Sequence, residues 1–99
     1  MSPSTTIRVA TDADAPALAL LLGELGYAVA ATDVPARVAR FRAQDNGEVL
    51  VAVQGDAPVA FAAVAITFPI HHAQPVAHLS AFAVARGVRR QGVGRRLLA

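Results

Sequence analysis

The chain has 99 residues, 55% of them hydrophobic and 16% charged, which is enough for one packed domain and too little for two. It contains no cysteine, which excludes disulfides and thiolate metal sites. The net charge of +2 is unevenly distributed, because residues 86–99 hold five arginines and no acid or aromatic residue, a pattern that favours a local anion site over nucleic-acid binding.

The first predicted elements are a short strand and a helix. Residues 7–10 alternate between apolar and polar, and Thr11 and Asp14 have the spacing of a capping box. Four leucines in residues 18–25 then recur at i, i+3, i+4 and i+7, and Gly26 is a suitable C-terminal stop. We therefore expect an amphipathic helix that ends at Gly26.

A second helix is predicted between Thr32 and the turn at residues 45–47. Val34, Val38 and Phe41 fall on one side of it, which is expected to face the core. The arginines expected on its solvated face are Arg37, Arg40 and Arg42.

Three strands are predicted next. Residues 48–54 alternate around valines, the pair at 55–56 is a two-residue hairpin signal, and residues 59–68 continue as a mostly apolar strand. Residues 69–75 are expected to form a loop, and residues 76–84 a further strand. The order strand, helix, helix, three strands and the start of a helix predicts an α/β fold, an α+β arrangement with a mixed sheet, in a single domain over residues 1–99.

The clearest chemistry follows the last predicted strand. The run there is Arg89, Arg90, Gln91, Gly92, Val93 and Gly94. Two glycines let the backbone approach a ligand closely, the first N–H groups of a helix lack partners, and the arginines add positive charge, so the run predicts a cradle for a diphosphate. These features alone do not distinguish coenzyme A from a nucleotide as the ligand. The run lacks the Gly-Lys-Ser/Thr ending of a P-loop and the Gly-x-Gly-x-x-Gly of a Rossmann fold, which disfavours these two nucleotide-binding motifs.

The run resembles the pyrophosphate signature Arg/Gln-x-x-Gly-x-Gly/Ala of the GCN5-related N-acetyltransferase (GNAT) family, with Arg89, Gly92 and Gly94 at its three defined positions. Residues 79–84 are similar to the fourth strand of that family, and the order of elements is similar over nearly the whole chain. Family members continue through a fifth strand, a fourth helix and two more strands, which have no counterpart in this sequence. The resemblance therefore implies the N-terminal portion of such a domain.

The resemblance implies an acyltransferase that moves an acetyl group from acetyl-CoA directly to an amine of a small molecule or peptide, without a metal. The backbone of Phe82, Ala83 and Val84 would bind the pantetheine arm, and residues 89–94 the diphosphate. The alternative is a fragment that keeps part of the coenzyme A site but is inactive alone, and acts at most as a binding or dimerising module. An open sheet edge could then pair with a second copy of the chain.

The general base is not evident from the sequence. Many relatives carry Glu or Asp three or four residues before the position of Val84, where this chain has Ala81 and Ser80. His78 is a weak candidate, on the same face as Ser80 and Phe82 if the strand alternates regularly, and Ser80 is another. An ordinary half-buried histidine without a catalytic role is the favoured interpretation of His78.

Other polar residues have plainer explanations. His71 and His72 point apart in an extended segment, so we expect loop residues and not metal ligands. Glu24 could line an acceptor cleft, but a solvated helix-end carboxylate is the favoured interpretation. Because no secretory signal or membrane-length apolar run is evident, a cytoplasmic protein without a membrane partner is expected.

Overall fold

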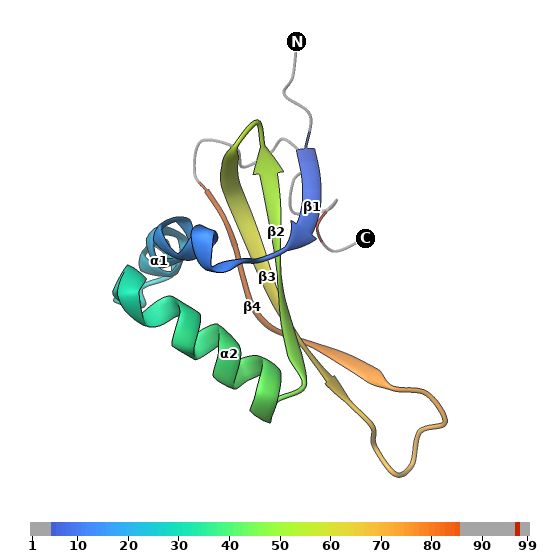
Figure 1. Cartoon of the computed structure of the whole chain (residues 1–99). Helices are drawn as coiled ribbons and strands as arrows, with labels where there is room; N and C mark the ends of the chain where they lie inside the picture. Colours follow the sequence, from blue (N-terminus) through green and yellow to red (C-terminus); the bar gives the residue numbers. More distant parts are fainter. Residues whose placement is uncertain (1–4, 86–96, 98–99) are drawn as a thin grey trace.

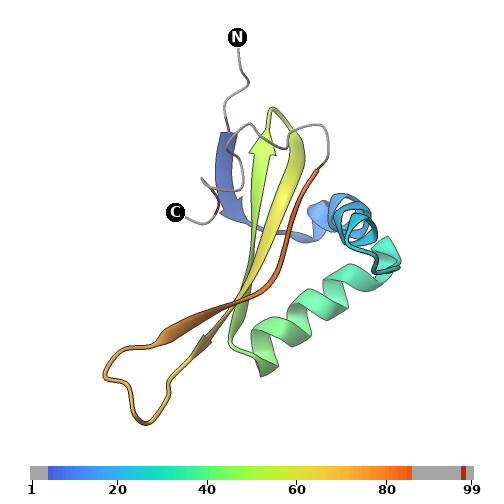
Figure 2. The same ribbon diagram turned by 180° about the vertical axis from the view of Figure 1, so that it is seen from behind.

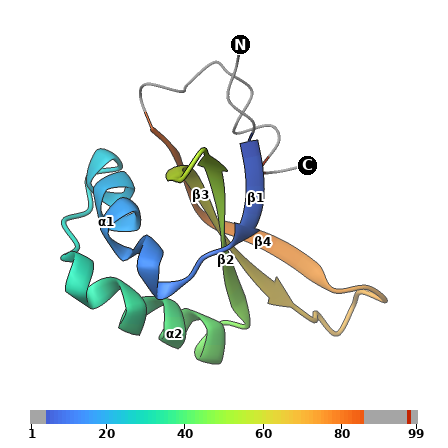
Figure 3. The same ribbon diagram turned by 45° about the horizontal axis from the view of Figure 1, so that its top comes forward.

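The computed structural model describes residues 5–85 and residue 97. The elements are β1 (Thr5–Val9), a 3₁₀ turn (Asp12–Asp14), α1 (Ala15–Glu24), a second 3₁₀ turn (Ala31–Asp33), α2 (Val34–Gln44), β2 (Gly47–Gln54), β3 (Ala57–Thr67) and β4 (Val76–Val84). The strands lie in the order β1-β2-β3-β4, and each neighbouring pair is antiparallel. Both helices cover the same face of this sheet (Figures 1 and 3). The predicted α/β fold class and the order of elements from β1 to β4 are confirmed, and these four strands form an antiparallel sheet where a mixed one was predicted.

The entry to α1 is fixed by a hydrogen-bonded carboxylate. Arg8 on β1 donates from its two terminal nitrogens to both oxygens of Asp14, at 2.7 and 2.8 Å, and the Thr11 N–H donates to Asp14 Oδ2 at 2.8 Å. These donors, Arg8 foremost, hold the pKa of Asp14 below its ordinary value although burial acts in the opposite direction. The predicted pairing of Thr11 with Asp14 is confirmed, and it links β1 to the start of α1.

The end of α1 depends on a backbone that favours glycine. Gly26 has a φ of +95°, and the N–H groups of Gly26 and Tyr27 donate to the carbonyls of Gly23 and Leu22, at 3.0 and 2.9 Å. This pair of bonds is a Schellman motif, in which a left-handed residue after the helix satisfies its last carbonyls. The predicted stop at Gly26 is confirmed.

The apolar side of α2 packs on the sheet as predicted. Val34 is buried, and Val38 and Phe41 pack against the core between the helices and the sheet. The ring of Phe41 lies so close to Gly47, the first residue of β2, that a Cβ there would overlap it. A side chain at Gly47 would therefore require the Phe41 ring to move.

Arg42 departs from the solvated position predicted for it. Its Nε donates to Glu48 Oε1 at 2.7 Å, and its terminal NH2 nitrogen donates to the carbonyl of Ala10 at 2.9 Å. Arg42 therefore links the last turn of α2 to β2 and to the segment after β1. It has a structural role that the helical pattern did not predict.

The sheet buries side chains on both faces. One cluster, under the helices, includes Leu18, Val51 and Phe61, and the other, on the opposite face, contains Ala52, Ala60, Ala62 and Leu97. The helical residue Leu97 is 5% exposed, so the chain beyond β4 returns to the face that α1 and α2 leave uncovered. The outer parts of β3 and β4 extend past the helices as a long hairpin arm (Figures 1 and 2).

Candidate functional site

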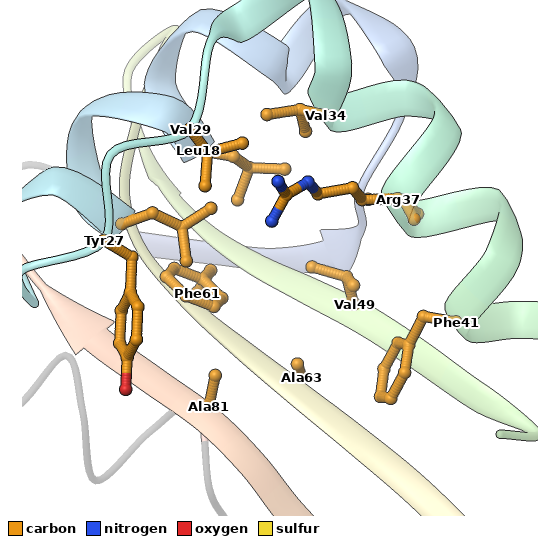
Figure 4. A pocket seen from close by; sticks show the side chains of 12 residues that line it. Leu18, Tyr27, Val29, Val34, Arg37, Phe41, Val49, Phe61, Ala63 and Ala81 are labelled. Atoms are coloured by element: carbon orange, nitrogen blue, oxygen red, sulfur yellow. The ribbon is translucent and has the colours of Figure 1, made fainter.

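A cavity of about 300 Å³ lies between the helices and the sheet. α1 and α2 form its walls, the connection between them closes one end, and β2, β3 and β4 form its floor (Figure 4). The lining residues are Leu18, Leu22, Tyr27, Val29, Val34, Arg37, Val38, Phe41, Val49, Phe61, Ala63 and Ala81. The volume is at the small end of the range for ligand pockets.

The cavity is apolar apart from two side chains. Arg37 extends from α2 with its guanidinium group directed into the cavity, and Tyr27 extends from the connection after α1 along the side that faces Ala81 (Figure 4). Arg37 is the one charged lining residue among those that the structure describes. Such a lining can enclose an apolar group and offers one strong site for an anion.

A second, more open hollow adjoins the first. It is lined by the C-terminal end of α2, by the outer part of β3, and by His78 and Ser80 of β4, with Phe41 shared between the two hollows. The Oγ1 atom of Thr67 lies 3.1 Å from Nε2 of His78, so the imidazole is held by one nitrogen. The two weak catalytic candidates are thus brought into the same hollow.

β4 contains a bulge at Ser80. Ala81 is opposite Ala63 and Leu79 is opposite Val64, so Ser80 is an extra residue with no counterpart on β3. The prediction that His78 shares a face with Phe82 is wrong for this reason. His78 pairs with Ala65 and lines the hollow beside Phe41, whereas Phe82 packs on the opposite face.

The outer edge of β4 exposes main-chain groups near the predicted pantetheine residues. The Ala85 N–H donates to the carbonyl of Val59 on β3 at 2.7 Å. Because residues of an antiparallel strand alternate in the direction of their N–H and C=O groups, those of Phe82 point away from β3. Phe82 and Val84 are half-buried and Ala83 is 5% exposed.

The predicted phosphate cradle lies outside the described residues. The run from Arg89 to Gly94 therefore stays a prediction from the sequence. The described residues on either side are consistent with a cradle between a strand and a helix. β4 ends at Val84, and Leu97 is helical and lies on the far face of the sheet.

The loop histidines and Glu24 do not join either hollow. His71 and His72 lie in a turn closed by the His72 N–H on the carbonyl of Pro69, and their ring centroids are 4.5 Å apart, so they do not point apart as expected. Glu24 is exposed and does not line the cavity. Within residues 5–85 and residue 97, no group of three or more His, Asp or Glu side chains is placed to hold a metal ion.

Sequence reasoning missed Arg37 and Tyr27 as lining residues. Arg37 was expected on a solvated face and is exposed, but it also lines the cavity, because Val34, Arg37, Val38 and Phe41 follow the i, i+3, i+4, i+7 spacing of a single helical stripe. A charge inside an apolar stripe was therefore a usable signal for Arg37. Tyr27 lies in an irregular connection, where no periodic pattern applies.

Comparison with known proteins defines the class. The sequence profile of the Acetyltransferase (GNAT) family matches residues 13–99. The chain therefore belongs to the GNAT acetyltransferase family, as its resemblance had indicated. A comparison with curated proteins gave no significant match.

Solved structures share the fold. A GNAT family acetyltransferase from Staphylococcus aureus superposes with a TM-score of 0.83 at 21% identity, over 99% of this chain and 73% of that one. An acetyltransferase from Trypanosoma brucei gives 0.80 at 22%, over 96% and 70%. Glucosamine-6-phosphate N-acetyltransferase from Arabidopsis thaliana gives 0.80 at 19%, over 96% and 69%. At these identities the likeness shows the fold alone.

One further property concerns membranes. Among the helices that the structure describes, none is long and apolar enough to cross a lipid bilayer.

Proposed function

We propose that this chain provides the donor-binding strand and acceptor cavity of an N-acetyltransferase that transfers the acetyl group of acetyl-CoA to the amine of a small molecule. The observation that carries the proposal is that three features lie next to one another on β4. Main-chain groups of Phe82 point away from β3, Ser80 forms a bulge, and Ala81 borders the cavity. A thioester held along this edge would lie beside a space for the acceptor. Family membership supports the same assignment.

The donor would bind along β4 and beyond it. Outward-pointing main-chain groups at Phe82 can hydrogen-bond the amides of a pantetheine arm as a neighbouring strand would. The run from Arg89 to Gly94 would hold the diphosphate, because glycines and arginines there suit an anion. The buried, helical Leu97 supports this path, since it places a helical residue beyond β4 on the far face of the sheet.

The reaction consists of one displacement. The amine nitrogen attacks the carbonyl carbon of the thioester, a C–N bond forms, the C–S bond breaks, and the thiolate leaves and takes up a proton. The amine must lose a proton to a base, and His78 is the candidate because it lies in the hollow that adjoins the bulge. Thr67 would orient its ring through the contact at Nε2.

Calorimetry and a turnover assay test the proposal together. Acetyl-CoA and desulfo-CoA are titrated into the full chain, and release of the coenzyme A thiol is followed with a panel of amines. Arg89→Glu should abolish binding of acetyl-CoA and of desulfo-CoA. Arg40→Glu makes the same charge change on the exposed surface of α2 and should leave binding of both unchanged. Equal affinity of the Arg89→Glu variant and the original chain would contradict the cradle.

A histidine variant tests the base. His78→Ala should lower turnover by about 100-fold or more and leave the affinity for acetyl-CoA unchanged. Unchanged turnover in this variant would show that His78 is not the base and that water removes the proton.

A binding module without activity is the second candidate. It is favoured by the fact that the chain spans 73% of the Staphylococcus aureus acetyltransferase and 69% of the Arabidopsis enzyme. Binding of acetyl-CoA without release of thiol for any amine would support this candidate over the enzyme.

A further inference from the structure

The cavity between the helices and the sheet has an apolar interior and a polar rim. Its buried and half-buried lining residues are all apolar, and the two polar ones, Tyr27 and Arg37, are exposed. Arg37 also lines a separate surface hollow with Asp33 and Arg40, so its charge stays in contact with solvent while its apolar stem covers the cavity. The interior therefore offers a ligand no polar side chain from the described residues.

Two small residues leave space on the floor of the cavity. Ala63 of β3 and Ala81 of β4 are directly opposite each other in the strand pairing, and both line the cavity (Figure 4). Water in such a space finds few hydrogen-bond partners, so an apolar group that displaces it binds favourably. A charged or hydroxylated group would lose its own hydration there without gaining a partner. The floor therefore favours a hydrocarbon group.

The bulge on β4 lies between this cavity and a polar hollow. Ala81 lines the cavity, whereas the preceding residue, Ser80, lines the second hollow together with His78. Among the described residues that line the second hollow, the charged one is Asp45, an acid. An amine beside Ser80 can therefore stay in polar surroundings while the rest of the same molecule lies in the cavity.

We propose that the acceptor is a primary amine with a small, uncharged hydrocarbon body, a short alkylamine or an arylalkylamine. Its body lies against Leu22, Phe61 and Ala63, and its amine lies at the bulge, beside Ser80. This proposal rests on the proposed acetyltransferase function, because it names the substrate class of that site. The cavity volume of about 300 Å³ limits the body to a small group.

Three amines of equal length test the proposal. Hexylamine, 5-aminopentan-1-ol and 1,5-diaminopentane differ in the group at the far end, which is a methyl, a hydroxyl or an ammonium. Each is titrated into the ¹⁵N-labelled full chain with and without saturating desulfo-CoA, and its dissociation constant is taken from the amide shifts. Hexylamine should bind about 10-fold or more tightly than the other two. From propylamine to pentylamine, each added methylene should tighten binding about 4-fold.

Two leucines of α1 provide a matched pair of variants. Leu22→Ala removes part of the cavity wall and should weaken the binding of hexylamine by about 10-fold. Leu20→Ala makes the same change two residues earlier, at a side chain that is 71% exposed and outside the cavity, and should leave binding unchanged. Thermal midpoints measured by circular dichroism check that both variants are folded.

Two alanines provide a second pair. Ala63→Leu fills the floor of the cavity and should remove the gain per methylene while propylamine still binds. Ala77→Leu adds the same side chain at an exposed position of β4 outside the cavity and should keep the gain. This pair locates the hydrocarbon body independently of the leucine variants.

The outcomes separate this proposal from the function on which it rests. Equal affinity for the three amines of equal length, no gain along the methylene series, no binding of hexylamine, or equal losses in Leu22→Ala and Leu20→Ala would each overturn the apolar-amine proposal. If acetyl-CoA fails to bind but hexylamine binds with the expected dependence on Leu22, the cavity proposal stands and the acetyltransferase function fails. If acetyl-CoA binds and 1,5-diaminopentane is acetylated as well as hexylamine, the function stands and the apolar-amine proposal fails.

Discussion

β2 and β4 belong to the same sheet but differ in burial and in strand pairing. β2 lies between β1 and β3. Val51 and Ala52 are adjacent residues of β2 that point to opposite faces of the sheet, and both are 0% exposed. β4 has one described neighbour, carries the bulge at Ser80, and is exposed over residues 77–80. The interior strand therefore supports the fold, and the edge strand is the one that we propose binds a ligand.

The difference has a simple physical cause. An interior strand has every backbone N–H and C=O paired, whereas an edge strand leaves alternate pairs of groups available. A bulge adds a residue that also escapes the ladder and bends the strand. β4 combines both features at the border of the cavity, whereas β2 is an interior strand. Mutations on the two strands should therefore have different effects.

The largest expected effect comes from placing the same charge on each strand. Val51→Asp buries a carboxylate without a partner and should destabilise the protein by more than about 4 kcal/mol, enough to prevent stable folding. Leu79→Asp on β4, where the side chain is 50% exposed, should cost about 1 kcal/mol or less. Urea unfolding followed by circular dichroism measures both. Comparable losses would show that β4 is as tightly packed as β2.

An intermediate effect is expected at the junction of β1 and α1, which anchors the packed part of the sheet. Asp14→Asn replaces a carboxylate that accepts two bonds from Arg8 and one from Thr11, and should cost about 1–3 kcal/mol at pH 7. Asp12→Asn is the control, because the Asp12 side chain is exposed and has no hydrogen bond to a described residue. A loss no larger in Asp14→Asn than in the control would show that the Arg8 interaction contributes little to stability.

The same pair predicts a pH dependence. Because the pKa of Asp14 is lowered in the folded state, its stabilising effect is complete above the unfolded value of about 3.9 and is lost as the pH falls through the lower folded value. The difference in unfolding free energy between the original chain and Asp14→Asn should shrink steadily in urea titrations from pH 5 to pH 2. A constant difference over that range would contradict this assignment.

The smallest effect distinguishes two glycines of α1. Gly26→Ala forces a side chain into a left-handed backbone with a φ of +95° and should cost about 1–2 kcal/mol. Gly23→Ala, inside the helix, should stabilise by up to about 1 kcal/mol. Neither Cβ would meet an atom within 4 Å, so backbone conformation alone separates the pair. Midpoints that shift in the same direction would refute that explanation.

The elements were predictable because their signals are local. The leucine spacing, Gly26, and the hairpin glycine Gly55 with its φ of +62° each act within a few residues. The bulge at Ser80 was not predictable, because an extra residue is defined only by the partner strand. Regular alternation therefore placed His78 on the wrong face.

The functional residues divide in the same way. The backbone groups at Phe82 belong to a strand that the pattern predicted, so their position followed from it. The long-range contact of Arg42 with Ala10 could not be read from the helical pattern, because the two residues are far apart in the sequence. Arg37 could have been identified, since its place in the apolar stripe of α2 is visible in the sequence.

Backbone NMR with acetyl-CoA tests the central claim most directly, because it compares the two strands within one experiment. On titration of the ¹⁵N-labelled chain, the amides of Phe82, Ala83 and Val84 should show the largest shifts among residues 5–85, and those of Val49, Val51 and Val53 on β2 should change little. Unshifted amides on β4, or larger shifts on β2 than on β4, would contradict the assignment of β4 as the strand that binds the acyl donor.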